Sequence, residues 1–205
     1  MEELPQGPLA QGNKEHGTGR VVTSWERLST RFVHRSSHFE LYEDILQLPN
    51  GETMLYTRFE SPPFSTVVPV TDEGEIVFVD NYRPPVGESL LELPGGMMDP
   101  GETPRQTALR ELEEETGYRA KKLVLLGWFY PSPHISSHRG NLFMARNLVK
   151  GKARPEESEG LRTILLPVRD AYKKLRAGQI HQSTAMLGLF MAEPFMTELK
   201  PRLRA

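Results

Sequence analysis

Apolar-rich runs broken by turn-forming residues fill the first part of the chain, and this pattern is typical of β-strands. Residues 38–48 and 52–59 form two such runs. The Asn50-Gly51 dipeptide between them predicts a hairpin turn, because both residues tolerate the positive φ angles that such turns require. Further strand-like runs are residues 66–70 and 75–79, around the turn signal Asp72-Glu73-Gly74, and then residues 123–128, 141–145 and 161–166.

The first clear helix signal begins at Thr103. Thr103 is expected to be the N-cap, and Pro104 fits the first helical position, where its missing N–H has no partner to lose. Gln106 completes a capping-box pattern with Thr103. Gly117 is expected to end the helix, because glycine readily adopts the left-handed conformation found there.

Two more helices are predicted near the C-terminus, over residues 168–176 and 183–195. Pro194 is expected to interrupt or end the second of them. Several strands with two or three helices on their faces predict an α/β or α+β sandwich. The predicted organisation is a disordered tail at residues 1–20, N-terminal β-strands at 21–60 that are expected to form a dimer, and the main domain at 61–200.

Length and composition restrict the class of protein. A chain of 205 residues suits one domain with a full hydrophobic core. A formal net charge of −2 argues against a globally basic nucleic-acid binder, and the absence of cysteine excludes disulfide scaffolds and thiol nucleophiles. The longest apolar run, residues 185–192, is far shorter than the roughly 20 residues of a membrane span. With no secretory signal pattern at its start, we expect a cytoplasmic protein that binds neither nucleic acid nor membranes.

Four glutamates gather in the first predicted helix. Glu111 and Glu115 are four residues apart and therefore share one face, with Glu114 on the same side, while Ala108 and Leu112 form the stripe that faces the core. Like charges at this spacing destabilise a helix by about 0.2–0.5 kcal/mol per pair. Two explanations remain open at this point: a solvated acidic face, or a site for Mg²⁺ or Mn²⁺, which prefer oxygen ligands.

Glycine and charged residues recur at fixed spacing around this helix. In order they are Gly96, Glu102, Arg110, Glu111, Leu112, Glu114, Glu115, Gly117 and Tyr118. This series resembles the Nudix box, with Tyr118 a loose fit to its last, apolar position. The resemblance implies a Nudix α/β/α sandwich with a mixed sheet. It also implies Mg²⁺-dependent hydrolysis, with Mn²⁺ as the alternative ion, of a nucleoside diphosphate linked to another group.

The resemblance also assigns roles by position. The implied metal ligands are Gly95, through its backbone carbonyl, Glu111 and Glu115. Glu114 is either a further ligand or the partner of Arg110, and Arg110 is implied to orient a glutamate. Glu102 is implied to support the start of the helix.

Two flanking segments resemble the ADP-ribose pyrophosphatase group of this family. They are Asn81-Tyr82-Arg83-Pro84 and Leu91-Glu92-Leu93-Pro94-Gly95-Gly96, in which Gly95 replaces the usual Ala. Arg83 is then the contact to the diphosphate, since a guanidinium fork matches phosphate oxygens, although a plain surface arginine is the alternative. Pro133, 16 positions after Gly117, marks the same group. The implied substrate-binding residues are Arg83, Met97, Ser132, Pro133 and His134.

The chain departs from this group at His134 and His138, which stand where the group usually has a glycine and a glutamate. An altered preference for the second group of the substrate is one interpretation, and a transition-metal site is an alternative. A base that activates water is implied in the acidic loop at residues 155–161. There Glu157 is the expected base and Glu159 a metal ligand or substitute base, whereas an acidic surface loop is the alternative.

The resemblance implies a homodimer in which N-terminal strands are packed or exchanged across the interface, with the Asn50-Gly51 hairpin as the candidate. Arg58 or Phe59 is then expected near the adenine, with Trp25 and Phe39 as alternatives. The implied reaction is hydrolysis of ADP-ribose to AMP and ribose 5-phosphate. Alternatives are another nucleotide sugar, such as ADP-glucose or GDP-mannose, or a nucleotide-binding module without catalysis.

Overall fold

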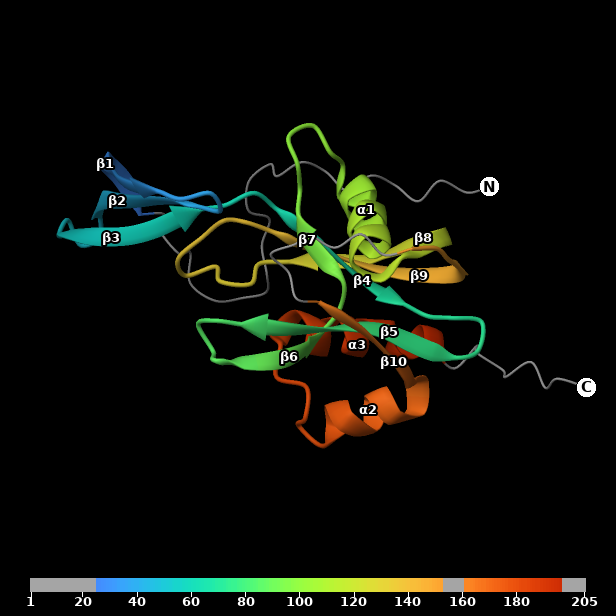
Figure 1. Ribbon diagram of the computed structural model, residues 1–205. Coiled ribbons are helices and arrows are strands. Elements are labelled where there is room, and N and C mark those ends of the chain that lie inside the picture. Colours follow the sequence, from blue (N-terminus) through green and yellow to red (C-terminus); the bar gives the residue numbers. More distant parts are fainter. Residues whose placement is uncertain (1–24, 153–160, 197–205) are drawn as a thin grey trace, which may run out of the picture.

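The computed structural model describes residues 25–152 and 161–196, which form three β-sheets and three α-helices (Figure 1). The central sheet has the strand order β7-β4-β9-β8 (Gly95–Met97, Phe64–Pro69, Gly140–Lys150 and Tyr118–Phe129). The second has the order β10-β5-β6 (Arg162–Pro167, Glu75–Arg83 and Glu88–Glu92). The third has the order β1-β2-β3 (Glu26–Arg35, Glu40–Gln47 and Thr53–Glu60). The helices are α1 (Pro104–Thr116), α2 (Val168–Arg176) and α3 (Ser183–Met196).

The central sheet is mixed, because β4 pairs in parallel with β9 and antiparallel with β7. Helix α1 packs on β4, β7 and β8, while α3 contacts β4, β6 and β9 (Figure 1). This arrangement confirms the predicted mixed α+β fold. Within the described residues, no helix combines the length and hydrophobicity that a membrane span needs.

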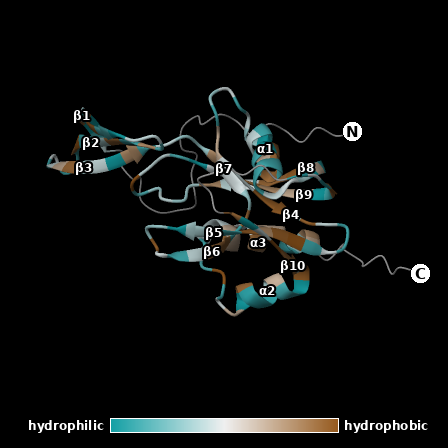
Figure 2. Ribbon diagram, in the orientation of Figure 1, coloured by the Kyte–Doolittle hydropathy of each residue, from teal (hydrophilic) through white to brown (hydrophobic). Residues whose placement is uncertain are grey.

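The core lies on both faces of strand β4. Val67 packs in a cluster with Ala108 and Leu112 of α1, whereas the next residue, Val68, packs in a second cluster with Leu189 of α3. All five residues are fully buried. Because successive strand side chains point to opposite faces and both faces are covered, the second half of β4 is a run of consecutive apolar residues, Val67, Val68 and Pro69, instead of an alternating pattern. Figure 2 shows the same concentration of hydrophobic residues along β4.

The two turn signals have different outcomes. The Asn50-Gly51 hairpin is confirmed, since β2 and β3 pair in antiparallel register up to Gln47 and Thr53, and Gly51 has a φ of 88°. The second signal also forms a turn, in which the N–H of Thr71 donates to the carbonyl of Glu75 at 2.9 Å. Its two strands separate into different sheets, however, because β4 pairs with β9 and β7, and β5 pairs with β10 and β6.

Helix α2 begins and ends as predicted, but α3 corrects one expectation. Pro194 neither interrupts nor ends α3, which continues to Met196. A proline in the last turn removes only one backbone hydrogen bond, and packing compensates for it, because Ala192 and Met196 are both buried. Sequence reasoning did not identify β6 and β7, because both are short, Pro94 lies between them and two of the three residues of β7 are glycines.

Strands β1 to β3 form a separate sheet beside the main body (Figure 1). Its polar centre is Asp44, which is 1% exposed. Asp44 accepts hydrogen bonds from Thr30 Oγ1 and Arg58 Nε, both at 2.7 Å, and pairs with Arg27 Nε at 3.0 Å. Burial acts to raise the pKa of Asp44, but the hydrogen bonds from Arg58 and Thr30 outweigh it and hold the pKa below its usual value.

Replacing Asp44 by Asn is expected to lower the free energy of unfolding at pH 7 by about 1–3 kcal/mol, because it removes the buried charge that pairs with Arg58 and Arg27. The pKa of Asp44 is lowered by folding, so its contribution is present above its unfolded pKa and is lost as the pH falls through the folded pKa. The difference between wild type and variant should therefore shrink as the pH falls below about 4. Urea unfolding at several pH values measures this.

The control is Asp72→Asn, at an exposed position in the turn after β4. It should leave the unfolding free energy within about 0.5 kcal/mol of wild type. Equal stabilities of wild type and Asp44→Asn at pH 7 would contradict the role of Asp44.

Candidate active site

Helix α1 begins and ends as its sequence predicts. The Oγ1 of Thr103 accepts the N–H of Gln106 at 3.3 Å, and Oε1 of Gln106 accepts the N–H of Thr103 at 2.8 Å. This reciprocal pair is a complete capping box. Gly117 ends the helix with a φ of 74°. Since Ala108 and Leu112 are fully buried, the rotation of the helix about its axis is fixed.

The carboxylates of Glu111 and Glu115 both lie against the Gly95-Gly96 segment of β7. The backbone N–H of Gly95 donates to Oε2 of Glu115 at 3.1 Å, and Glu115 is buried. A Cβ atom added to Gly96 would stand 2.2 Å from Oε1 of Glu111, so this carboxylate fills the space of the missing side chain. The structure therefore brings together the three residues that the resemblance implies as metal ligands.

Gly95 also permits the close approach of β7 to β4. A Cβ atom added there would stand 2.4 Å from the carbonyl oxygen of Ser65 and 2.8 Å from the Cα of Thr66. Both atoms belong to the backbone, which gives way less easily than the end of a side chain. The contact between β7 and β4 therefore leaves no room for a Cβ atom at Gly95, the position where the resembling group usually has alanine.

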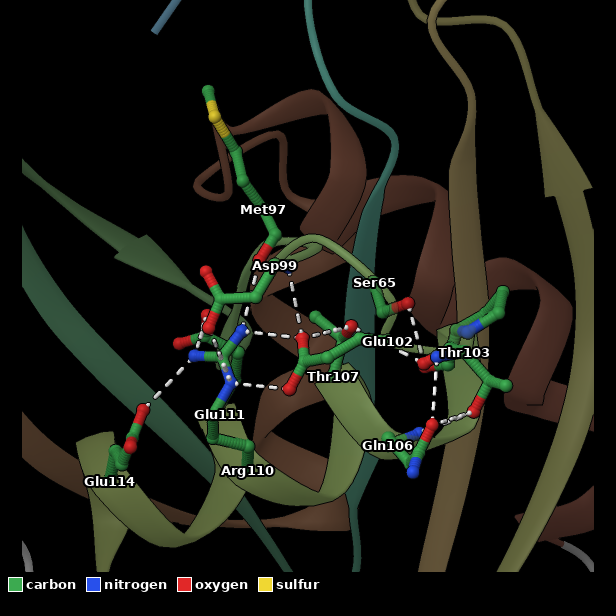
Figure 3. Close-up of polar contacts among 11 residues, drawn as sticks. Ser65, Met97, Asp99, Glu102, Thr103, Gln106, Thr107, Arg110, Glu111 and Glu114 are labelled. Carbon is green, nitrogen blue, oxygen red and sulfur yellow. Dashed lines mark hydrogen bonds and ion pairs between the residues drawn. The ribbon is translucent and has the colours of Figure 1, made fainter. Parts of the chain in front are cut away.

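Arg110 lies at the centre of the acidic residues (Figure 3). Its Nε donates to Glu102 at 2.9 Å, and its Nη1 donates to Glu111 at 2.7 Å and to Glu114 at 3.1 Å. Its Nη2 donates to the backbone carbonyl of Met97 at 3.0 Å. One guanidinium therefore offsets the repulsion among three carboxylates and holds Glu111 in one orientation.

Glu102 is held ionised in this network. The hydrogen bond from Arg110, supported by those from Thr107 Oγ1 and the N–H of Asp99, lowers the pKa of Glu102 from 4.5 to about 2. The same carboxylate links the loop before α1 to the helix (Figure 3), because Asp99 precedes the helix and Thr107 lies within it. Its place agrees with the implied role at the start of the helix.

The donor atoms fit a hard divalent cation. Glu111 and Glu115 offer carboxylate oxygens and Gly95 a backbone carbonyl, which are the ligand types of Mg²⁺ and Mn²⁺. Across residues 25–152 and 161–196, no group of three or more His, Cys, Asp or Glu side chains is arranged to hold a metal ion. Two carboxylates of α1 thus need further oxygen donors, and the candidates Glu157 and Glu159 lie outside the described residues.

Arg83 has a partner that sequence reasoning missed. Its Nε donates to Oε1 of Glu92 at 2.8 Å, and its Nη2 donates to Oε2 at 2.6 Å. Glu92 is 4% exposed, whereas the side chain of Arg83 is 48% exposed. The signal in the sequence was the position of Glu92 between Leu91 and Leu93, because a carboxylate that is buried among apolar residues needs a charged partner.

The loop after β8 holds the other implied substrate residues. The carbonyl of Ser132 accepts the backbone N–H groups of Ile135 and Ser136, at 3.0 and 2.9 Å, and so closes a turn. Pro133 and His134 line a cavity of about 450 Å³ that lies between this loop and β3. Met97 is placed elsewhere, on β7, where its carbonyl binds Arg110.

Strand β3 supplies the other side of this cavity. Tyr56, Arg58 and Phe59 line it, and the hydroxyl of Tyr56 donates to the carbonyl of His134. The backbone N–H of Phe59 donates to the carbonyl of Ile135 at 3.0 Å. Arg58 and Phe59 were candidates for contact with the adenine, whereas the place of Tyr56 was not foreseen.

The two histidines of the loop serve different contacts. The ring of His138 lies 5.3 Å from that of Phe59 and 5.9 Å from that of Phe64, measured between centroids, and burial lowers the pKa of His138. Its Nδ1 lies 2.9 Å from Oγ of Ser136. In the described part of the chain, His134 and His138 join no metal-binding group, so the structure offers no support for a transition-metal site.

The two neighbouring glycines allow a matched pair of variants. Gly95→Ala places a Cβ against the backbone of β4 and should lower the unfolding free energy by about 1–3 kcal/mol. Gly96→Ala places it against the movable carboxylate of Glu111, so we expect a smaller loss of stability but at least a tenfold weaker affinity for Mn²⁺, roughly the scale of a disturbed metal site. Thermal unfolding and titration calorimetry with Mn²⁺ separate the two effects. Unchanged Mn²⁺ affinity in Gly96→Ala would contradict the placement of Glu111.

Comparisons with known proteins point to one family. The family model of the NUDIX domain matches residues 62–186. ADP-ribose pyrophosphatase of Bacillus subtilis (strain 168) is 36% identical over 146 residues, which cover 70% of this chain and 79% of that protein. Methanol dehydrogenase activator of Bacillus methanolicus is 35% identical over 164 residues, covering 79% and 89%.

A solved structure has the same fold. The crystal structure of an ADP compounds hydrolase superposes with a TM-score of 0.78, covering 87% of this chain and 97% of that one at 24% sequence identity. The family model covers more than half of the chain, and the acidic helix of its characteristic motif lies against the glycine pair as described above. The chain therefore belongs to the Nudix family.

Proposed function

We propose that this protein hydrolyses ADP-ribose to AMP and ribose 5-phosphate. The observation that carries the proposal is the convergence of Glu111 and Glu115 on the Gly95-Gly96 segment, with Arg110 holding Glu111 in place. Two relatives named ADP-ribose pyrophosphatase support the choice of substrate: that of Bacillus subtilis and that of Mycobacterium tuberculosis (strain ATCC 25618 / H37Rv), the latter 29% identical. In this reaction water adds to one phosphorus and the bridging P–O bond breaks.

Nudix hydrolases generally need a divalent metal ion. In our proposal the ion is Mg²⁺, with Mn²⁺ as a substitute, held by Glu111, Glu115 and the Gly95 carbonyl. When bound, such an ion lowers the pKa of a coordinated water and neutralises charge on the diphosphate. Arg110 fixes the carboxylate of Glu111, and Glu114 is either a further ligand or only the second partner of Arg110.

The remaining roles follow the family pattern. We assign the base that activates water to Glu157, with Glu159 as a metal ligand or a substitute base. Arg83 is assigned to the diphosphate, because a guanidinium matches phosphate oxygens and nearly half of the Arg83 side chain is exposed. We place the nucleotide in the cavity beside Pro133 and His134, where Tyr56, Phe59 and Arg58 offer aromatic and cationic contacts. Ser132 is assigned to substrate binding through the turn that its carbonyl closes, and Met97 through β7, where its carbonyl holds Arg110.

We further propose that residues 21–60 form a homodimer interface and that residues 61–200 form the catalytic unit. The β1-β3 sheet exposes large apolar side chains that a monomer would leave in water. The most exposed of them are Leu28, Phe32 and Leu55, at 49%, 52% and 58%.

Product analysis tests the proposed reaction. Purified protein is incubated with Mg²⁺ and a panel of ADP-ribose, ADP-glucose and GDP-mannose, and the nucleotides are separated by chromatography. We expect AMP from ADP-ribose, and an intact panel when EDTA removes the metal. Absence of AMP from ADP-ribose with either Mg²⁺ or Mn²⁺ would overturn the substrate assignment.

Glu111→Gln and Glu115→Gln are each expected to lower kcat by about 100-fold or more, because each removes a charged oxygen donor from the metal site. The matched control is Glu113→Gln, which neutralises an exposed glutamate of the same helix and should keep wild-type turnover. Circular dichroism checks that all three variants fold. Near-normal turnover in Glu111→Gln or Glu115→Gln would refute the metal assignment.

The interface is tested by charge insertion. Phe32→Glu combined with Leu55→Glu should convert a dimer, of twice the 23.3 kDa chain mass, into a monomer, because two carboxylates cannot be buried unpaired. Gln179→Glu introduces a carboxylate at an exposed position after α2, outside this sheet, and is the control that should leave the mass unchanged. Light scattering after size exclusion measures the mass, and a wild-type monomer would reject the interface.

A further inference from the structure

The pair formed by Arg83 and Glu92 has a geometry that surface ion pairs seldom have. Both carboxylate oxygens of Glu92 accept hydrogen bonds from one guanidinium, at 2.8 and 2.6 Å. This fork fixes the plane of the guanidinium as well as its position. The pair is also asymmetric: the carboxylate is buried, and nearly half of the arginine side chain faces solvent. The buried carboxylate of Glu92 thus fixes the position of the exposed guanidinium of Arg83.

Arg83 binds Glu92 although another glutamate, Glu88, lies directly opposite it on the neighbouring strand. In the β5-β6 ladder, Arg83 stands opposite Glu88, which is exposed, while Glu92 stands opposite Val79. The side chain of Arg83 nevertheless forks onto Glu92, near the end of β6. A buried ion pair contributes little net stability compared with well-packed apolar residues in its place, because the desolvation of the charges offsets their attraction. Stability alone therefore does not account for a glutamate at this position.

The position of Glu92 connects Arg83 to the metal site. Three residues after Glu92, the N–H of Gly95 donates to Glu115 at 3.1 Å. Between them, the carbonyl of Pro94 accepts the N–H of Val67 at 2.9 Å, which ties the segment to the central sheet. One short, anchored segment thus carries the partner of Arg83 at one end and the contact to Glu115 at the other.

We infer that Glu92 is a positioning residue, which holds the guanidinium of Arg83 in the orientation that binds the diphosphate of the substrate. Glu92 does not itself touch the substrate. Glu92 orients Arg83 before the substrate binds, so that binding does not require the ordering of a mobile arginine side chain. This inference rests on the proposed function, since it takes the diphosphate as the ligand of Arg83.

A double-mutant cycle tests the inference, with wild type, Glu92→Gln, Arg83→Ala and the combined variant. Glutamine keeps the shape of the side chain but places an N–H₂ group opposite the guanidinium. Both groups are donors, so one of the two hydrogen bonds is lost. We expect Glu92→Gln to raise KM for ADP-ribose by about tenfold, with a smaller change in kcat, on the scale found for residues that orient a ligand-binding group. In the Arg83→Ala background the same substitution should change kcat/KM less than about twofold, because its effect passes through Arg83.

Two readouts separate positioning from a general structural role. The Mg²⁺ concentration for half-maximal activity should be unchanged in Glu92→Gln, because the carboxylates of α1 are intact. The control is Glu88→Gln, the neighbour of Arg83 in the ladder, which should keep the wild-type KM. If Glu92→Gln does not fold, as judged by circular dichroism, Glu92→Asp replaces it in the cycle, because it keeps the charge but shortens the reach.

The outcomes are distinguishable. Equal losses of kcat/KM with and without Arg83, or a wild-type KM in Glu92→Gln, would overturn the positioning role. If wild type leaves ADP-ribose intact, the proposed function fails instead. The cycle is then measured on the nucleotide sugar of the panel that is hydrolysed, where additive losses still overturn the role of Glu92. A wild type that hydrolyses no member of the panel overturns both.

Discussion

The close packing of the Gly95-Gly96 segment between β4 and α1 is the constraint on which the site depends. Gly95 allows β7 to approach the backbone of Ser65, and Gly96 leaves a space that the carboxylate of Glu111 fills. Any larger side chain here displaces either the strand or the carboxylate. The carbonyl of the next residue, Met97, accepts a hydrogen bond from Arg110. The same close approach therefore sets the position of the guanidinium that binds Glu111 and Glu114.

The acidic helix and the cavity belong to different parts of the architecture. The carboxylates are anchored to the central sheet, through a capped helix whose apolar stripe is fully buried. The loop with Pro133 and His134 is tied instead to β3, by hydrogen bonds from Tyr56 and Phe59. The family match begins at residue 62, just after β3 ends at Glu60. The proposed metal ligands Gly95, Glu111 and Glu115 therefore lie in the part of the chain that matches the family, whereas one wall of the cavity comes from the additional sheet.

Much of the candidate site could be predicted from sequence because its residues are close together in the chain. The shared face of Glu111 and Glu115 follows from helical periodicity, and the pairing of Arg110 with Glu114 follows from their spacing. The fork between Arg83 and Glu92 was not predicted, because it depends on how two strands pair. The close contact of Gly95 with Ser65 was missed for the same reason: 30 positions separate the two residues in the sequence.

The sequence by itself determined the features that depend on a few adjacent residues: the capping box at Thr103, the end of α1 at Gly117 and the Asn50-Gly51 hairpin. Each depends on hydrogen bonds or φ angles within about four residues. Only the tertiary structure decided that β4 and β5 separate into different sheets and that α3 continues past Pro194. Those outcomes depend on burial against distant segments, where packing outweighs local preference.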